Sequence, residues 1–122
     1  MRLILESEQR IRLTTDDEGF AIEAAGGDLS PFHFLAASLA SCTHSVLVTW
    51  AAHADLDIAG LEITVEWEFG GDPFQVSVMA MALVWPALPP ERREAARRAA
   101  VQCTVHATLE HGTRVETTVA SP

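Results

Sequence analysis

Residues 30–47 read Ser-Pro-Phe-His-Phe-Leu-Ala-Ala-Ser-Leu-Ala-Ser-Cys-Thr-His-Ser-Val-Leu, with no Asp, Glu, Lys or Arg. Ser30 followed by Pro31 is typical of a helix N-cap and first turn. Larger side chains then recur at three- and four-residue steps: Leu35, Leu39, Cys42, Val46 and Trp50. This spacing predicts one long helix to about residue 54. A helix with so little polarity needs cover on most of its sides.

The uncharged stretch extends over residues 29–54, which is long enough to span a bilayer. It nevertheless contains three histidines and several Ser and Thr residues, and its neighbours resemble strands of a globular protein. We therefore predict a buried core helix and no membrane span.

Alternating side chains predict strands on both sides of this helix. In residues 1–25, Arg10 and Arg12 alternate with Ile11 and Leu13, so the two arginines share one face of a strand. Residues 16–19 indicate a turn, and residues 20–23 a further short strand. Residues 61–69 alternate apolar and mostly acidic side chains, and residues 74–85 form a long partner strand after a Gly-Gly-Asp-Pro turn.

The remaining segments complete an α+β chain. Glu91 opens an amphipathic helix, and Cys103 falls at or just past its end. Gly112 stops the helical region, and residues 113–119 indicate a last strand. The order of strands, helix, hairpin, helix and strand predicts a single α+β domain over residues 1–122 with antiparallel pairing.

Composition excludes several classes of partner. The 122 residues have a net charge of −9 and contain no lysine, which argues against binding to nucleic acid or to an anionic membrane. The first residues do not form a signal peptide, because their apolar run is short and acids follow at once. We expect a cytoplasmic protein, in which two cysteines stay reduced and are catalytic or metal-binding more often than structural.

The two cysteines are the candidate functional residues. A thiol reacts as its thiolate, so it needs positive charge or a helix N-terminus nearby. Cys42 lies roughly three turns into its own helix, too deep for that helix's dipole to act on it. Without lysine, the candidates for its activation are Arg10, Arg12 or a histidine. The alternative is that both cysteines are small core residues, and spacing alone does not decide between the two.

A metal site is a further alternative. His44 is two residues after Cys42 and points to nearly the opposite side of the helix. His106, three residues after Cys103, shares a face with it if the helix continues. A zinc ion could in principle be held by Cys42, Cys103, His106 and one more group, although each pair of candidate ligands is too isolated to form a clear zinc motif.

Two motifs in this sequence resemble one family. Residues 30–43 resemble the central-helix signature of the osmotically inducible protein C / organic hydroperoxide resistance (OsmC/Ohr) family, in which a proline and Leu and Ala positions precede a reactive cysteine. Residues 103–109, Cys-Thr-Val-His-Ala-Thr-Leu, resemble that family's second signature, usually Cys-Pro-Val-His with a following leucine. The order of elements agrees, so the resemblance covers essentially the whole chain.

The resemblance implies a fold, a partner and an activity. It implies antiparallel sheets wrapped around a long central apolar helix, in an intertwined homodimer. It also implies a thiol peroxidase in which Cys42 attacks an organic hydroperoxide and becomes a sulfenic acid, Cys103 resolves it to a disulfide, and an external dithiol reduces that disulfide. No bound cofactor is required, and Arg10, or Arg12 on the same face, is the implied activating arginine.

The sequence departs from the family pattern at two places. Phe32 and His33 occupy the positions where the family has a glutamate that orients the arginine, and Thr104 stands where proline is usual. His33 could take over the polar role. The alternative function is a catalytically weak or inactive OsmC-like protein that binds a small molecule or senses redox state.

Overall fold

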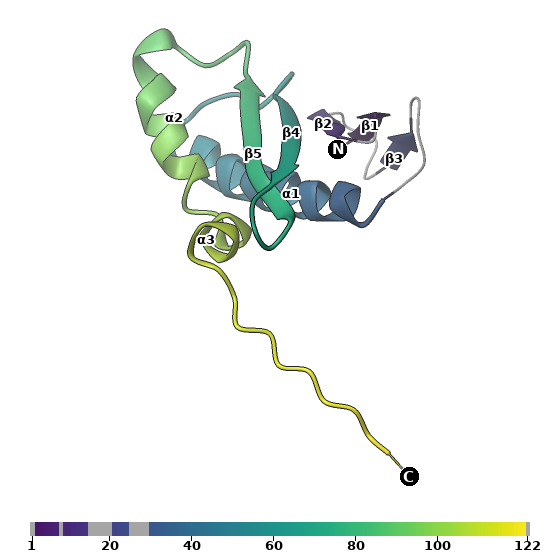
Figure 1. Ribbon diagram of the computed structural model, residues 1–122. Coiled ribbons are helices and arrows are strands. Elements are labelled where there is room, and N and C mark those ends of the chain that lie inside the picture. Colours follow the sequence, from purple (N-terminus) through teal and green to yellow (C-terminus); the bar gives the residue numbers. More distant parts are fainter. Residues whose placement is uncertain (1, 8, 15–20, 25–29, 122) are drawn as a thin grey trace.

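The computed structural model describes residues 2–7, 9–14, 21–24 and 30–121 (Figure 1). Five strands and three helices lie in these residues, with a single 3-10 turn, η1, at Pro90–Arg92. The strands are β1 Arg2–Ser7, β2 Arg10–Thr14, β3 Ala21–Ala24, β4 Glu62–Gly70 and β5 Gln75–Val84. The helices are α1 Pro31–His53, α2 Arg93–Ala100 and α3 Thr104–His111. The α+β class is confirmed.

The strands form one sheet in the order β3-β1-β2-β4-β5. Pairing is antiparallel, as predicted, except between β1 and β3, which are parallel. Arg2 is opposite Thr14 of β2 and also opposite Ala21 of β3, so β3 starts at the end of the sheet where β2 finishes. This geometry makes β3 run in the direction of β1. The turn expected at residues 16–19 lies outside the described residues, as does Phe20 of the strand expected there.

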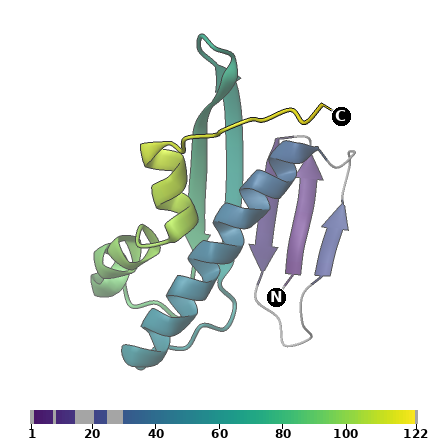
Figure 2. The ribbon, with the colours of Figure 1, turned by 90° about the horizontal axis from the view of Figure 1, so that it is seen from below.

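Helix α1 lies across one face of this sheet (Figure 2). Ile11 and Leu13 of β2 and Ile63 and Val65 of β4 are fully buried on that face. They pack in one core cluster with apolar residues of α1: Ala36, Leu39, Ala40, Leu47 and Ala51. The helix is long and apolar enough to cross a membrane by length and composition. Because it packs on the sheet, it is the core helix that the sequence predicted.

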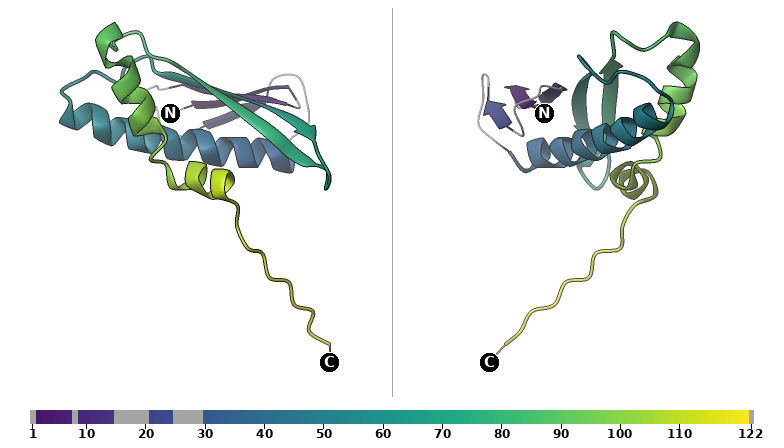
Figure 3. Two further views of the ribbon diagram at one scale, coloured as in Figure 1. Left: turned by 60° about the vertical axis from the view of Figure 1, so that its left-hand side comes forward. Right: turned by 180° about the vertical axis from the view of Figure 1, so that it is seen from behind.

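Helices α2 and α3 complete the side of the molecule next to α1 and β5 (Figures 2 and 3). Cys103 falls just past the end of α2, as predicted, but the helix does not continue through it. The chain turns at residues 101–102, and Cys103 becomes the N-cap of a new helix, with φ −60° and ψ 130°. Gly112 ends α3 with φ 78°, a left-handed conformation that glycine adopts without strain.

The strand expected at residues 113–119 is not formed. The chain beyond Gly112 has no regular secondary structure and runs away from the body (Figures 1 and 3). Val115 is 81% exposed and Val119 is 90% exposed. Alternation of side chains shows that a segment suits a sheet, but a strand also needs an unpaired edge beside it, and this segment pairs with no strand among the residues that the structure describes.

Candidate active site

The fold brings Cys42 and Cys103 together. Cys42 lies on the middle of α1, and Cys103 lies at the start of α3, which packs beside α1. Both thiols are free, and they lie close enough to influence each other's ionisation. Cys103 is fully buried, whereas Cys42 is partly exposed. A peroxide or alkylating reagent therefore meets the sulfur of Cys42 first.

The N-terminus of α3 lies beside both cysteines. Cys103 caps the helix, and its Sγ accepts a hydrogen bond from the N–H of His106 at 3.3 Å. The backbone N–H groups of Thr104 and Val105 lie near enough to Cys42 to favour its ionised form. The first turn of α3, whose N–H groups have no partner within the helix, therefore lies against the two cysteines.

This arrangement separates the pKa values of the two thiols. Burial raises the pKa of Cys42, but hydrogen bonds from the Cys103 thiol and from the N–H groups of Val105 and Thr104 outweigh it, so the pKa is lowered from 9.0. Burial is also the largest influence on Cys103, and with the hydrogen bond to Cys42 it raises the pKa of that thiol. Cys42 is the thiol that ionises first, and Cys103 is its proton-bearing neighbour.

Thr43 is a second neighbour of Cys103 that the sequence did not indicate. It is fully buried next to Cys42 on α1, and its hydroxyl favours the ionised form of Cys103. The hydroxyl approaches the sulfur without the geometry of a full hydrogen bond, since Oγ1 has no such partner in the described residues. Its effect only partly offsets the burial of Cys103.

His33 belongs to the start of α1. It is 1% exposed, and its Nδ1 accepts a hydrogen bond from the backbone N–H of Ser30 at 3.1 Å and lies 2.8 Å from the Ser30 hydroxyl. Its ring also packs edge-on against Trp67, with 5.1 Å between the centroids. These contacts close a capping box at the first turn of α1, in which histidine replaces the usual Glu or Gln.

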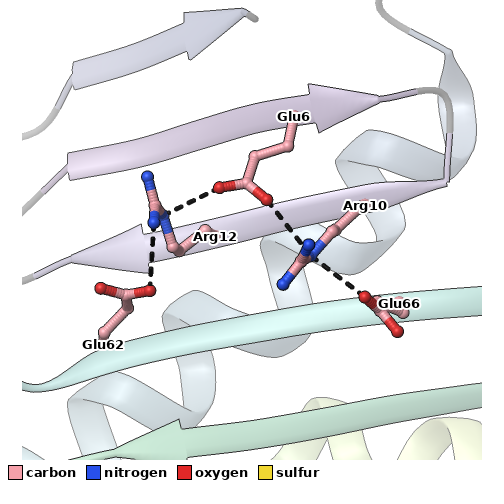
Figure 4. Close-up of polar contacts among 5 residues, drawn as sticks. All are labelled: Glu6, Arg10, Arg12, Glu62 and Glu66. Atoms are coloured by element: carbon pink, nitrogen blue, oxygen red, sulfur yellow. Dashed lines mark hydrogen bonds and ion pairs between the residues drawn. The ribbon is translucent and has the colours of Figure 1, made fainter.

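The two arginines lie on the opposite face of the sheet. Side chains alternate along β2, so Arg10 and Arg12 point away from α1 where Ile11 and Leu13 point toward it. Glu6 bridges the two arginines at 3.2 Å and 3.1 Å, while Arg10 also pairs with Glu66 at 3.0 Å and Arg12 with Glu62 at 3.3 Å (Figure 4). This chain of five side chains, the charge ladder, joins β1, β2 and β4. The prediction that Arg10 or Arg12 activates Cys42 therefore has no support within one protomer.

His106 contributes its backbone to the site. While its N–H donates to Cys103, its ring Nε2 lies 3.1 Å from Glu110 of the same helix. The part of the chain that the structure describes contains no group of three or more His, Cys, Asp or Glu side chains able to hold a metal ion. The zinc alternative thus finds no ligand set in those residues.

An apolar cavity of about 860 Å³ lies beside this site. Its walls come from β5, α2 and the loop between them, and Leu39 of α1 and His106 of α3 also line it. Met79, Met81 and Leu83 form the wall on β5, and Arg93 and Arg97 lie on the α2 side. The volume is within the usual range of small-molecule sites, and the lining suits an apolar ligand with a polar or anionic end.

The site thus has two thiols whose pKa values are shifted in opposite directions, one on the core helix α1 and one at the first turn of α3. These features describe an α+β protein with a dithiol site. The sequence profile of the OsmC-like protein family matches residues 24–118, and the chain belongs to this family. The resemblance drawn from the two motifs is confirmed.

Two solved structures are similar to this chain. One is described as an osmotic stress induced and detoxification response protein from Psychrobacter arcticus 273-4; it is 23% identical, with a TM-score of 0.60 over 87% of this chain and 84% of that one. The other is an OsmC-like hydroperoxide resistance protein from Jannaschia sp. CCS1, 16% identical, with a TM-score of 0.63 over 93% and 86%. At these identities the likeness establishes the fold. A comparison with curated protein sequences gives no match.

Proposed function

We propose that this protein is a thiol-dependent peroxidase that reduces organic hydroperoxides as part of a response to oxidative stress. The observation that carries the proposal is the contact between two free thiols of opposite pKa shift, with the more acidic one on the accessible side. Membership of the OsmC-like family and the hydroperoxide resistance protein among its structural neighbours support the same role.

The proposed reaction needs only the two cysteines and an external reductant. The Cys42 thiolate attacks the outer oxygen of the hydroperoxide, the O–O bond breaks, and the alkoxide leaves with a proton as an alcohol. Cys42 is then a sulfenic acid, and the Cys103 sulfur attacks it to form a disulfide and water. A dithiol reduces the disulfide by exchange, which restores both thiols and leaves the dithiol oxidised. No bound cofactor takes part.

We also propose that the protein acts as a homodimer. On the side of α1 away from the sheet, small residues such as Ser38 and Ser45 alternate with exposed Phe34 and Val48. The serine hydroxyls donate hydrogen bonds to carbonyls of their own helix. Such a surface allows close approach of a second α1. The unpaired segment 113–121 and the apolar edge strand β5 are the other surfaces that a second copy would cover.

We place this single OsmC-like domain, residues 1–122, in the cytoplasm, where both thiols stay reduced between turnovers. In a homodimer the charge ladder of one protomer could approach the partner's site, and this is the remaining route by which Arg10 or Arg12 would act on Cys42. His33 and His106 act as structural supports of α1 and α3 in this proposal.

Steady-state turnover tests the proposed function. An alkyl hydroperoxide is supplied with a dihydrolipoyl or a thioredoxin-type dithiol, and the wild type is compared with Cys42→Ser. The wild type should consume hydroperoxide in proportion to enzyme concentration, and the variant should be at background. Equal background rates for both proteins would remove the enzyme proposal.

The second candidate is a non-catalytic protein that binds a small molecule or senses redox state. The apolar cavity beside the cysteines favours it, because a cavity of that volume can hold a ligand without any chemistry at sulfur. Mass spectrometry after one equivalent of peroxide separates the two. A Cys42–Cys103 disulfide, two hydrogens lighter, supports the peroxidase, and unreacted thiols support the binding protein.

A further inference from the structure

We propose that the cavity between β5 and α2 binds an apolar molecule that ends in a carboxylate, and that Arg93 is the residue that selects the anionic end. The inference deepens the proposed function, on which it rests only where the bound molecule is treated as the substrate. Binding itself needs no reaction at sulfur. It follows from the distribution of charged, apolar and unpartnered side chains around the cavity.

Helix α2 gives the cavity a charged mouth and an apolar floor. Four of its residues line the cavity, at three- and four-residue steps that place them on one face of the helix: Arg93, Ala96, Arg97 and Ala100. The two alanines are buried, at 2% and 3% exposure, whereas the two arginines are exposed. Because all four line the same space, the arginines lie at its mouth and the alanines lie deeper.

The other walls of the cavity suit the apolar part of a ligand. The two methionines and the leucine of β5 described above pack against the core. Trp85 also lines the cavity, but its Nε1 donates to the carbonyl of Asp57 at 2.8 Å, so the ring is left as an apolar surface. The ring Nε2 of His106 lies 3.1 Å from Glu110. A charged or polar end of a ligand is therefore better placed at the mouth than on these walls.

The charges around the cavity differ in sign from those of the chain as a whole. The protein has 17 acids and a net charge of −9, yet no Asp or Glu is among the described residues that line this cavity. Two arginines and one histidine line it instead. Residues 91–98 contain four of the eight arginines and two of the acids. This local excess of positive charge attracts an anion within the screening length of physiological salt, about 8 Å.

Arg93 is the guanidinium at the mouth that is available to a ligand. Arg97 is held by Glu94, with its Nε at 3.0 Å from both carboxylate oxygens. The side chain of Arg93 makes no ion pair or hydrogen bond with the residues that the structure describes. A guanidinium has only donors, and its planar fork fits the two oxygens of a carboxylate. One available guanidinium also matches the single negative charge of a carboxylate.

The cavity extends from Arg93 toward the two cysteines. Arg93 is the first residue of α2, and Cys103 lies three residues past the end of that helix, which is about 10 Å long. At the far end the lining includes Leu39, one turn before Cys42 on α1, and His106 of α3. A molecule with its carboxylate on Arg93 therefore directs its apolar chain toward the dithiol site. In the proposed reaction, the hydroperoxide group would be carried on that chain.

Methionine methyl NMR measures binding at this cavity in the full-length chain. Of the three methionines, Met79 and Met81 line the cavity, and the third is Met1. The protein is titrated at neutral pH, under reducing conditions, with decanoate and separately with decanol. The two probes have the same chain and differ in charge, and the shifts of the Met79 and Met81 signals give a Kd for each.

Arg93→Gln is the test variant, and Arg98→Gln is its matched control. Arg98 is exposed on the same helix and does not line the cavity, so the two variants change the net charge equally. We expect Arg93→Gln to bind decanoate about tenfold more weakly than the wild type, through loss of a charge-assisted contact. Arg98→Gln should stay within about twofold, because its charge is screened at that distance from the ligand. Both variants should bind decanol as the wild type does.

Three results would overturn the proposal: methyl signals that decanoate does not shift, an equal loss of decanoate affinity in the two variants, or an equal loss of decanoate and decanol affinity in Arg93→Gln. If Arg93→Gln does not fold, the wild type supplies the test. Its affinity for decanoate should fall as salt is raised while that for decanol does not fall, and a fall in both would equally overturn the proposal.

The same measurements separate this inference from the proposed function. A protein that binds decanoate through Arg93 but does not turn over an alkyl hydroperoxide keeps the inference and loses the proposed function. A protein that turns over the hydroperoxide but binds decanoate with no contribution from Arg93 does the opposite.

Discussion

Replacing Cys103 by alanine or by serine separates its two roles. In the structure its sulfur caps α3 by accepting the His106 N–H, and it fills a fully buried position beside Cys42. Serine keeps an acceptor of similar size at that position, whereas alanine keeps neither the acceptor nor the volume. In the proposed reaction, both substitutions remove the resolving thiol.

The stability difference follows from these contacts. Loss of an N-cap acceptor costs about 1 kcal/mol. The space left by the sulfur, close to that of one methylene, costs roughly another 1 kcal/mol. Cys103→Ala should therefore unfold about 2 kcal/mol more easily than the wild type, a fall in Tm of roughly 6–10 °C for a chain of this length. Cys103→Ser should lie within about 1 kcal/mol of the wild type.

The assay pairs thermal unfolding, at equal protein concentration and under reducing conditions, with one equivalent of hydroperoxide. Both variants should oxidise Cys42 once and then stop, with the sulfenic acid trapped by a dimedone-type reagent and no sustained turnover. Equal Tm values for the two variants would refute the capping role of the sulfur. Sustained turnover by Cys103→Ser at the wild-type rate would refute its role as the resolving thiol.

Three other predictions follow from the fold. His33→Ala should lower the free energy of unfolding in urea by about 2–3 kcal/mol, because it removes a cap partner of Ser30 and a buried ring, and an unchanged midpoint would contradict the capping box. Arg10→Ala should cost no more than about 1 kcal/mol, less at high salt, because the ladder is partly exposed; an altered alkylation midpoint at Cys42 would show that Arg10 reaches the site across a dimer. Deletion of residues 113–122 should shift the chain from dimer to monomer in sedimentation velocity, and an unchanged sedimentation coefficient would exclude a role of that segment in assembly.

The sequence predicted the helices and strands in which the order of apolar and polar side chains matches the buried and exposed positions. Helix α1 starts at Pro31 after Ser30, and β4 buries the apolar half of its alternation, including Ile63 and Val65. The segment 113–119 has the same alternation but no strand in the protomer. The alternation shows which side chains would share a face of a strand. Whether the strand forms also depends on an unpaired sheet edge, which another part of the structure or another copy of the chain must supply.

For the candidate site, too, local sequence patterns predicted some features, and others depend on contacts between distant parts of the chain. The pairing of Cys42 with Cys103 came from the resemblance, and no spacing rule links residues 61 positions apart. The sequence named Arg10, Arg12 or a histidine as the group that activates Cys42, and the structure places both arginines on the face of the sheet away from α1. A signal against the arginines was present: Arg10 and Arg12 alternate with Ile11 and Leu13, which already placed them on the solvent side of the strand.

The complete burial of Cys103 has a consequence for the proposed disulfide, because it determines which of the two sulfurs a reductant could reach. Exchange is fastest when the leaving thiol is acidic, which would favour attack on Cys103 and departure of Cys42. Solvent access favours the opposite direction of attack, because an incoming thiolate reaches the partly exposed sulfur of Cys42. Cys103, whose thiol has the raised pKa, would then be the leaving group. In the proposed reaction, the mixed disulfide would therefore form on Cys42, and re-reduction would be limited by protonation of a poor leaving group. A reductant with a narrow, protruding thiol has the advantage over a broad one at such a site.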